Sequence, residues 1–178
     1  MQLCTFMDGI FTSGKIVETE AYKAPEDKAS HAYGNKRTNR TETIFSTGGV
    51  AYVYLCYGIH HLFNIVTGEK DQAHAILVRG LEPVEGIEHM LARRKMTKMH
   101  PRISNGPGIL SKALGITTKM DGRALYTKDA VWIEKRRKSD REVDIISGPR
   151  VGVGYAQECA EWPWRFRIKG NPYCSPAK

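Results

Sequence analysis

The stretch Val17-Glu18-Thr19-Glu20-Ala21-Tyr22 (VETEAY) is the starting point for both the fold and the chemistry of this chain. Residues 15–22 are predicted to form a strand, entered through a turn at residues 12–14 (TSG). Because side chains alternate along a strand, Glu18, Glu20 and Tyr22 are expected to share one face. The sequence therefore places a carboxylate beside an aromatic ring.

A second segment, Tyr52-Val53-Tyr54-Leu55-Cys56-Tyr57-Gly58, places three tyrosines within six positions and ends at a turn. Residues 51–56 predict a strand, residues 57–60 a reversal and residues 61–66 the return strand of a β-hairpin. Tyr52 and Tyr54 share a face, and ordinary sheet packing competes there with stacking on a flat ligand. Tyr57 falls at the tip, where little protein can cover it, and a ring at such a tip can wedge between stacked bases.

The rest of the chain predicts further strands at residues 75–79, 131–133 and 164–168, and a long polar loop over residues 23–40. An amphipathic helix is expected from about residue 84, and a second helix opens at Gly106-Pro107-Gly108 and stops at Gly115. This order indicates an α+β fold. We expect a single compact domain over residues 1–178, with a mainly antiparallel curved β-sheet, flanking helices and a protruding β-hairpin.

Composition narrows the class of protein. A chain of 178 residues that is 41% hydrophobic can bury a proper core, which excludes a disordered segment. No apolar run approaches the roughly 20 residues that span a bilayer, and no signal-peptide core precedes Phe11, so a membrane or secreted protein is not expected. The four scattered cysteines have no zinc spacing and predict free thiols in a reducing compartment, with no metal or cofactor.

The net charge of +8 suggests a polyanion as partner. Lysine and arginine gather at residues 36–40, 93–102 and 135–138. Neutralisation of phosphates by such side chains, with release of counterions, supplies non-specific affinity for nucleic acids. A solvated basic surface that keeps the protein soluble is the alternative.

Glu20 is the strongest candidate for chemistry, because a placed carboxylate can orient and deprotonate a water. The alternative is an edge-strand glutamate that faces solvent. Glu18 lies about 7 Å away by strand rise, so a carboxylate pair is possible, although a supporting role is favoured. Arg79 ends an apolar strand and is expected to meet a carboxylate or phosphate. Asn64, if buried, must bond either to backbone or to the edge of a ligand.

Several motifs occur in a fixed order along nearly the whole chain: residues 16–22, residues 51–54 with Tyr57-Gly58, Asn64, Leu77-Val78-Arg79 with Leu81-Glu82-Pro83, Gly106-Pro107-Gly108, Arg150-Val151-Gly152-Val153-Gly154, Arg165-Phe166 and Gly170-Asn171-Pro172. Together they resemble the alkyladenine (3-methyladenine) DNA glycosylase family. The chain departs from the family at Ile109, where a lysine is common, and at its start, where the family usually carries a helix before the first strands.

The resemblance implies a monofunctional DNA glycosylase that flips an alkylated or deaminated purine from the duplex and hydrolyses its N-glycosidic bond. It implies that Glu20 is the general base for the attacking water, and that Arg79 and the backbone carbonyl of Val151 help to hold this water. Double-stranded DNA with damaged purines is the expected partner, the protein is expected to act as a monomer, and no cofactor is implied. The expected location is the cytoplasm, associated with the nucleoid, or the nucleus.

The resemblance also assigns the residues that would contact DNA. Tyr22, His31 and Tyr54 would form the stacking walls and edge contacts of the base pocket. Asn64 would screen purines by their 2-amino group. Tyr57 would be the wedge that fills the gap left by the flipped base.

Three other functions compete with the glycosylase. A non-catalytic basic nucleic-acid-binding module would use the basic face and Tyr57 alone, so a substitution of Glu20 would not matter. A carbohydrate hydrolase would use Glu18 and Glu20 as an equal pair. A hydrolase of free nucleosides would be nearly independent of salt, whereas an enzyme that acts on duplexes loses affinity as salt rises.

Overall fold

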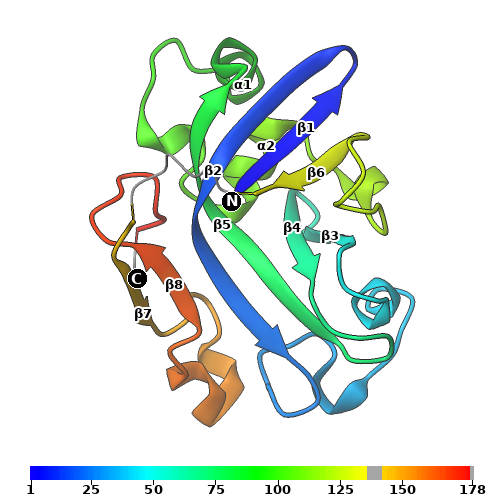
Figure 1. The fold of residues 1–178 in the computed structure, drawn as a ribbon. Helices are drawn as coiled ribbons and strands as arrows, with labels where there is room; N and C mark the ends of the chain where they lie inside the picture. The colour runs from blue at the N-terminus through cyan, green and yellow to red at the C-terminus, as the bar shows by residue number, and fades with distance from the viewer. Residues whose placement is uncertain (136–141, 177–178) are drawn as a thin grey trace.

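A computed structural model gives the fold of residues 1–135 and 142–176. Within these residues eight strands form one curved sheet in which every pairing is antiparallel (Figure 1). The sheet order is β3-β4-β5-β2-β1-β6, and β8 joins β2 with β7 on its outer side. The strands are β1 (Gln2–Met7), β2 (Ile10–Lys23), β3 (Ala51–Cys56), β4 (His60–Val66), β5 (His74–Glu85), β6 (Val131–Glu134), β7 (Ile145–Gly148) and β8 (Arg165–Ile168).

Strand β2 forms the spine of the sheet (Figure 1). It pairs with β5 along one side, and on the other side with β1 over its first half and with β8 at Glu18–Glu20. The middle of β2 is thus bonded on both sides, and Glu18 and Glu20 are buried. This arrangement corrects one expectation, since residues 12–14 lie inside β2 and form no turn. The turn that precedes β2 is Asp8-Gly9, where both residues have positive φ (52° and 77°), as two-residue hairpin turns require.

The β3–β4 hairpin is confirmed. β3 has the expected bounds, and β4 begins one residue earlier than expected. Tyr57 and Gly58 make the turn with φ values of 51° and 72°. The Tyr57 side chain is 92% exposed, so the tip projects a bare aromatic ring into solvent.

Two α-helices are formed within the described residues, α1 (Ile87–Arg94) and α2 (Pro107–Leu114). The expected start of the first helix near residue 84 is wrong, because β5 stays paired with β2 as far as Glu85 and Gly86 then turns the chain at φ 69°. The second helix is confirmed with its end at Gly115. Short 3-10 helices cover Tyr33–Asn35, Glu42–Phe45, Pro101–Ile103, Thr118–Met120 and Gly154–Glu161.

The main core lies between the sheet and the two α-helices. Leu3 of β1, Phe63 of β4 and Leu81 of β5 are fully buried there with Met90 of α1 and Leu110 of α2. Helix α2 packs against β4 and β5, which confirms an α+β fold with helices that flank a curved antiparallel sheet. Most of the third basic cluster, Arg136-Arg137-Lys138, lies outside the described residues.

Candidate active site

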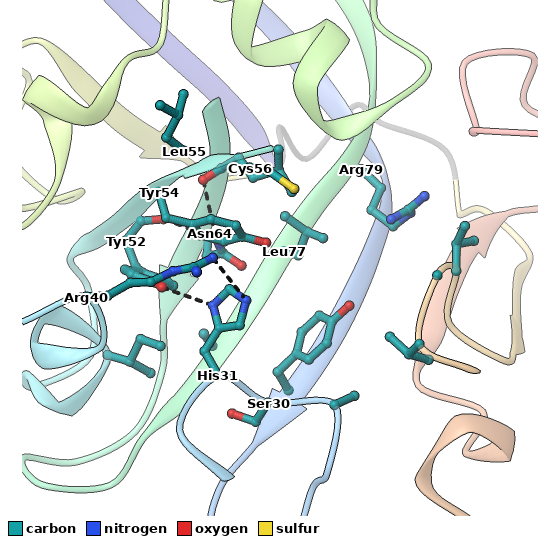
Figure 2. A pocket seen from close by; sticks show the side chains of 18 of the residues that line it. Ser30, His31, Arg40, Tyr52, Tyr54, Leu55, Cys56, Asn64, Leu77 and Arg79 are labelled. Carbon is teal, nitrogen blue, oxygen red and sulfur yellow. Dashed lines mark hydrogen bonds between the residues drawn. The ribbon is translucent and has the colours of Figure 1, made fainter. Parts of the chain in front are cut away.

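A pocket of about 450 Å³ opens between the β3–β4 hairpin, the loop after β2 and the segment after β7 (Figure 2). It brings together residues that are far apart in the sequence. Every predicted site residue except Glu20 lines it: Tyr22, His31, Tyr54, Tyr57, Asn64, Arg79 and Val151. Glu20 lies behind this lining and is 0% exposed.

One wall of the pocket is aromatic (Figure 2). The rings of His31 and Tyr54 meet edge to face, with centroids 4.6 Å apart, and Tyr52 lies next to Tyr54 at 5.3 Å. The hydroxyl of Tyr52 is 3.1 Å from Nδ1 of His31. Tyr52 also lines the pocket and is 3% exposed, so it packs within the wall against Tyr54 and His31. Sequence reasoning did not assign a role to Arg40, whose guanidinium lies 5.1 Å from the centre of the Tyr54 ring and whose Nη2 is 3.4 Å from Nε2 of His31.

His31 is expected to be neutral at physiological pH. Burial of the ring among the pocket walls and then the Arg40 charge lower the pKa of His31 from 6.5 to about 4, even though the residue as a whole is exposed to solvent. We expect Arg40→Gln to raise this pKa in part, because burial remains. An NMR titration of the imidazole measures it, and Arg37→Gln, on the same loop but paired with Glu42 and Asp71, is the control.

The same shift has a consequence for stability. Because the pKa of His31 is lower in the folded protein, the unfolded chain takes up the proton first as the pH falls, and stability is lost between about pH 6.5 and about pH 4. If the NMR titration of His31 in the wild-type protein had its midpoint between pH 6 and 7, both the lowered pKa and the pH dependence of stability would be contradicted.

The Glu20 carboxylate is held by three donors. Its Oε1 accepts a hydrogen bond of 2.7 Å from the backbone N–H of Val151. Its Oε2 accepts 2.8 Å from the hydroxyl of Tyr22 and 3.3 Å from Nη1 of Arg79. A carboxylate offers about four lone-pair sites, so one acceptor position is left. Val151 thus contacts Glu20 through its amide, and the role implied for its carbonyl stays a prediction.

The neutral form of Tyr22 is favoured. Burial, and then the neighbouring charge of Glu20, raise the pKa of Tyr22 well above its ordinary value. Its hydroxyl therefore keeps its proton and donates to Glu20, while its ring lies 4.7 Å from the guanidinium of Arg150. Tyr22 forms part of the pocket wall in front of the carboxylate.

Arg79 meets carboxylates, as the sequence predicts. It lies between Glu18 and Glu20, with Nε 3.2 Å from Oε1 of Glu18 and Nη1 3.3 Å from Oε2 of Glu20. Glu18 is buried and does not line the pocket described here. The two carboxylates are therefore not equivalent, which agrees with the supporting role favoured for Glu18.

Asn64 is buried, and its amide nitrogen donates to the backbone carbonyls of Tyr52 (3.1 Å) and Leu62 (3.4 Å). Of the two partners expected for a buried Asn64, backbone or ligand, the backbone is thus confirmed for the amide nitrogen. The side chain still lines the pocket (Figure 2), so its implied contact with a purine edge stays a prediction.

A buried ion pair between Arg150 and Asp27, which the sequence did not predict, supports the groups that contact Glu20. Arg150 contacts both oxygens of Asp27, with Nη1 at 2.5 Å and Nη2 at 2.8 Å, and both side chains are 0% exposed. Arg150 also donates to the backbone carbonyls of Ala21 and Cys159. Because Arg150 lies under Tyr22 and precedes Val151, this pair positions two of the groups that contact Glu20.

Within residues 1–135 and 142–176 no cluster of three or more potential metal-binding side chains is present. The same residues contain no helix long and apolar enough to cross a bilayer. The four cysteines are free thiols, as expected.

The curved antiparallel sheet thus carries a pocket with aromatic walls and a buried carboxylate behind them. A family model described as methylpurine-DNA glycosylase matches residues 1–172. Two similar curated proteins, from Bacillus cereus and Bacillus mycoides, are 45% identical to this chain over 182 residues, and both carry the provisional name 3-methyladenine DNA glycosylase. The alignments cover 98% of this chain and 88% and 89% of those proteins, respectively. The chain belongs to the methylpurine-DNA glycosylase family and is a hydrolase of N-glycosyl bonds.

Proposed function

We propose that the protein flips alkylated or deaminated purines from double-stranded DNA and cleaves their N-glycosidic bond with a water activated by Glu20. The observation that carries the proposal is the buried Glu20 carboxylate directly behind a pocket with aromatic walls. Its three donors fix its orientation and leave one acceptor position for a water. Arg79 and Val151, which line the pocket and contact Glu20, border the place where that water would lie.

The size and the aromatic walls of the pocket suit a flat, electron-poor ring. Its volume of about 450 Å³ falls in the range of small-molecule sites, and Tyr22, His31 and Tyr54 supply rings to its walls. Stacking on aromatic side chains offsets the few kcal/mol that base flipping costs. An alkylated purine carries positive charge and is a good leaving group. The enzyme then has to stabilise an oxocarbenium-like transition state and place a water, as in glycoside hydrolysis in general.

The proposal is tested with duplexes that each carry one lesion: 3-methyladenine, 7-methylguanine, hypoxanthine or ethenoadenine. After incubation with the protein, alkali cleaves the strand wherever a base has been released. We expect release of alkylated purines and of hypoxanthine. Release of none of the four bases would contradict the proposal, and release of the alkylated bases alone would remove deaminated purines from it.

Tyr57 is proposed as the wedge, because it is 92% exposed at the tip of a hairpin that borders the pocket along its length. We expect Tyr57→Ala to weaken binding of a lesion duplex by about 1–3 kcal/mol, the value of one base–aromatic stack. Folding stability should not change. Titration by fluorescence anisotropy measures the effect, and Tyr126→Ala, which removes another exposed tyrosine (78%), is the control. Equal affinities for the two variants would exclude the wedge.

Binding of the duplex, action as a monomer and a nucleoid-associated cytoplasmic location are parts of the same proposal. The net charge of +8 favours a duplex over a free nucleoside, so affinity should fall steeply as salt rises. The relatives named above are bacterial, which favours the nucleoid-associated location over the nuclear one.

A further inference from the structure

We infer that Glu18 and Ser175 are positioning residues for the reaction: they hold the guanidinium of Arg79 in the orientation from which it contacts Glu20. This inference rests on the proposed role of Glu20 as general base. It gives a function to a buried carboxylate that the proposed mechanism does not use and to a segment near the C-terminal end of the described chain.

Glu18 lies at the centre of a buried polar cluster. Its Oε1 accepts hydrogen bonds from Nε of Arg79 (3.2 Å), from Nε of Arg165 (2.7 Å) and from the hydroxyl of Ser175 (2.7 Å). Its Oε2 accepts the backbone N–H of Ser175. The side chain of Glu18 is 0% exposed, so its oxygens depend on these protein donors for their hydrogen bonds.

Each nitrogen of the Arg79 guanidinium has its own oxygen partner. Nε contacts Glu18, Nη1 contacts Glu20, and Nη2 lies 3.4 Å from the hydroxyl of Ser175. A guanidinium is a rigid planar fork, so a rotation that brings a second nitrogen to Glu20 would break the contact with Glu18 or with Ser175. The cluster therefore limits Arg79 to a single nitrogen on the Glu20 carboxylate.

This limit matters for the chemistry. Arginine and carboxylate readily form two parallel hydrogen bonds when nothing restrains them. Such a two-pronged pair would occupy the last acceptor position of Glu20, which the proposed water needs. Glu18 and Ser175 thus act through Arg79 and touch neither water nor base.

The segment that carries Ser175 is seated tightly on the sheet. A Cβ at Gly80 would lie 2.6 Å from the carbonyl oxygen of Tyr173 and 3.0 Å from the Cβ of Glu18, so a glycine is needed at this position. Nη2 of Arg165 donates to the carbonyl of Ser175 at 2.9 Å and so also holds the segment. The Ser175 segment is therefore held from β2, β5 and β8, and its partner on β2, Glu18, lies two residues before Glu20.

A double-mutant cycle tests the inference. We expect Glu18→Gln to slow single-turnover base release about 10- to 100-fold, as small misplacements in active sites do, with unchanged affinity for a duplex that carries a stable abasic analogue. In an Arg79→Gln background the same substitution should cause no further loss. Effects that multiply would mean that Glu18 acts through the fold and not through Arg79, which would overturn the inference.

Ser175→Ala gives a second measurement that leaves all charges in place, and it decides the question if Glu18→Gln does not fold. We expect slower release with unchanged duplex affinity, and recovery in Ser175→Thr, which restores the hydroxyl. Ser104→Ala is the matched control. Ser104 is fully buried, and its hydroxyl donates to the carbonyl of Leu81, which lies on β5, the strand that carries Arg79. Equal rates for Ser175→Ala and Ser104→Ala would overturn the inference.

Failure of this inference and failure of the proposed function give different results. If Glu20→Gln keeps its activity, the proposed mechanism is wrong. If Glu20→Gln is inactive while Glu18→Gln and Ser175→Ala release bases at the wild-type rate, the general base stands and the inference on positioning alone is wrong.

Discussion

Glu20→Gln is expected to slow base release by about 10²–10⁴-fold, the usual contribution of a general acid or base. Glutamine has the same size as glutamate, and its single carbonyl oxygen can take the place of Oε2 and accept from Tyr22 and Arg79. Its amide nitrogen would then face the N–H of Val151, and the side chain cannot take a proton from water. Glu20 is 0% exposed and so contributes no surface to DNA binding. Single-turnover release of 3-methyladenine measures the rate, and affinity for the same duplex should be unchanged.

The control for this substitution is Glu88→Gln, which removes the same charge from an exposed position on α1. A Glu20→Gln rate within about threefold of the wild type would contradict the general-base mechanism, since a residue in that role contributes far more. The pairing of Glu20 with Arg79 also means that the folded state of the variant should be verified by urea unfolding.

Asp27→Asn is expected to destabilise the fold by about 3–5 kcal/mol, the usual cost of leaving one member of a buried ion pair without its partner. Asp27 accepts two bonds from Arg150 and one of 3.0 Å from the N–H of Ala29 at a fully buried position. An amide group there would turn one N–H toward the guanidinium. The free energy of unfolding in urea measures the loss.

Asp129→Asn is the matched control, because it also breaks a contact of 2.5 Å between aspartate and arginine, but at an exposed site with Arg123. Exposed pairs are worth about 0–1 kcal/mol. We expect Asp27→Asn to lower activity as well where the protein is still folded, since Arg150 supports Tyr22. If the two variants lost the same free energy, the pair would have no special structural role.

The strands whose limits are marked by local signals could be predicted from the sequence. The β3–β4 hairpin follows from two apolar segments that meet at Tyr57-Gly58, and its first strand has the predicted bounds. The predicted start of β2 at residue 15 was wrong, because residues 12–14 have the composition of a turn but lie within the strand. Gly14 serves packing instead, since a Cβ there would lie 1.8 Å from Cδ2 of Leu81. The Asp8-Gly9 pair was the correct turn signal, and it stands in the sequence.

The candidate site could be predicted in its parts but not in its connections. A carboxylate and a tyrosine two residues apart on a strand must share a face, so the contact of Glu20 with Tyr22 follows from local geometry. The pairs of Glu18 with Ser175 and of Asp27 with Arg150 join residues that are 157 and 123 positions apart. Such contacts depend on the whole topology, and no local pattern of residue types indicates them.

The two walls of the pocket differ in how easily they can deform. At Thr19 the backbone is paired with both β5 and β8, so two ladders must open before Glu20 can move. His31 and Arg40 stand on the loop between β2 and β3, outside the paired strands, so no strand ladder has to open for their side chains to move. The side of the site that holds Glu20 is therefore fixed by the sheet, whereas the side that carries His31 and Arg40 can adjust. We therefore expect the loop to adapt to purines of different outline, while Glu20, the proposed general base, keeps the same position relative to the pocket.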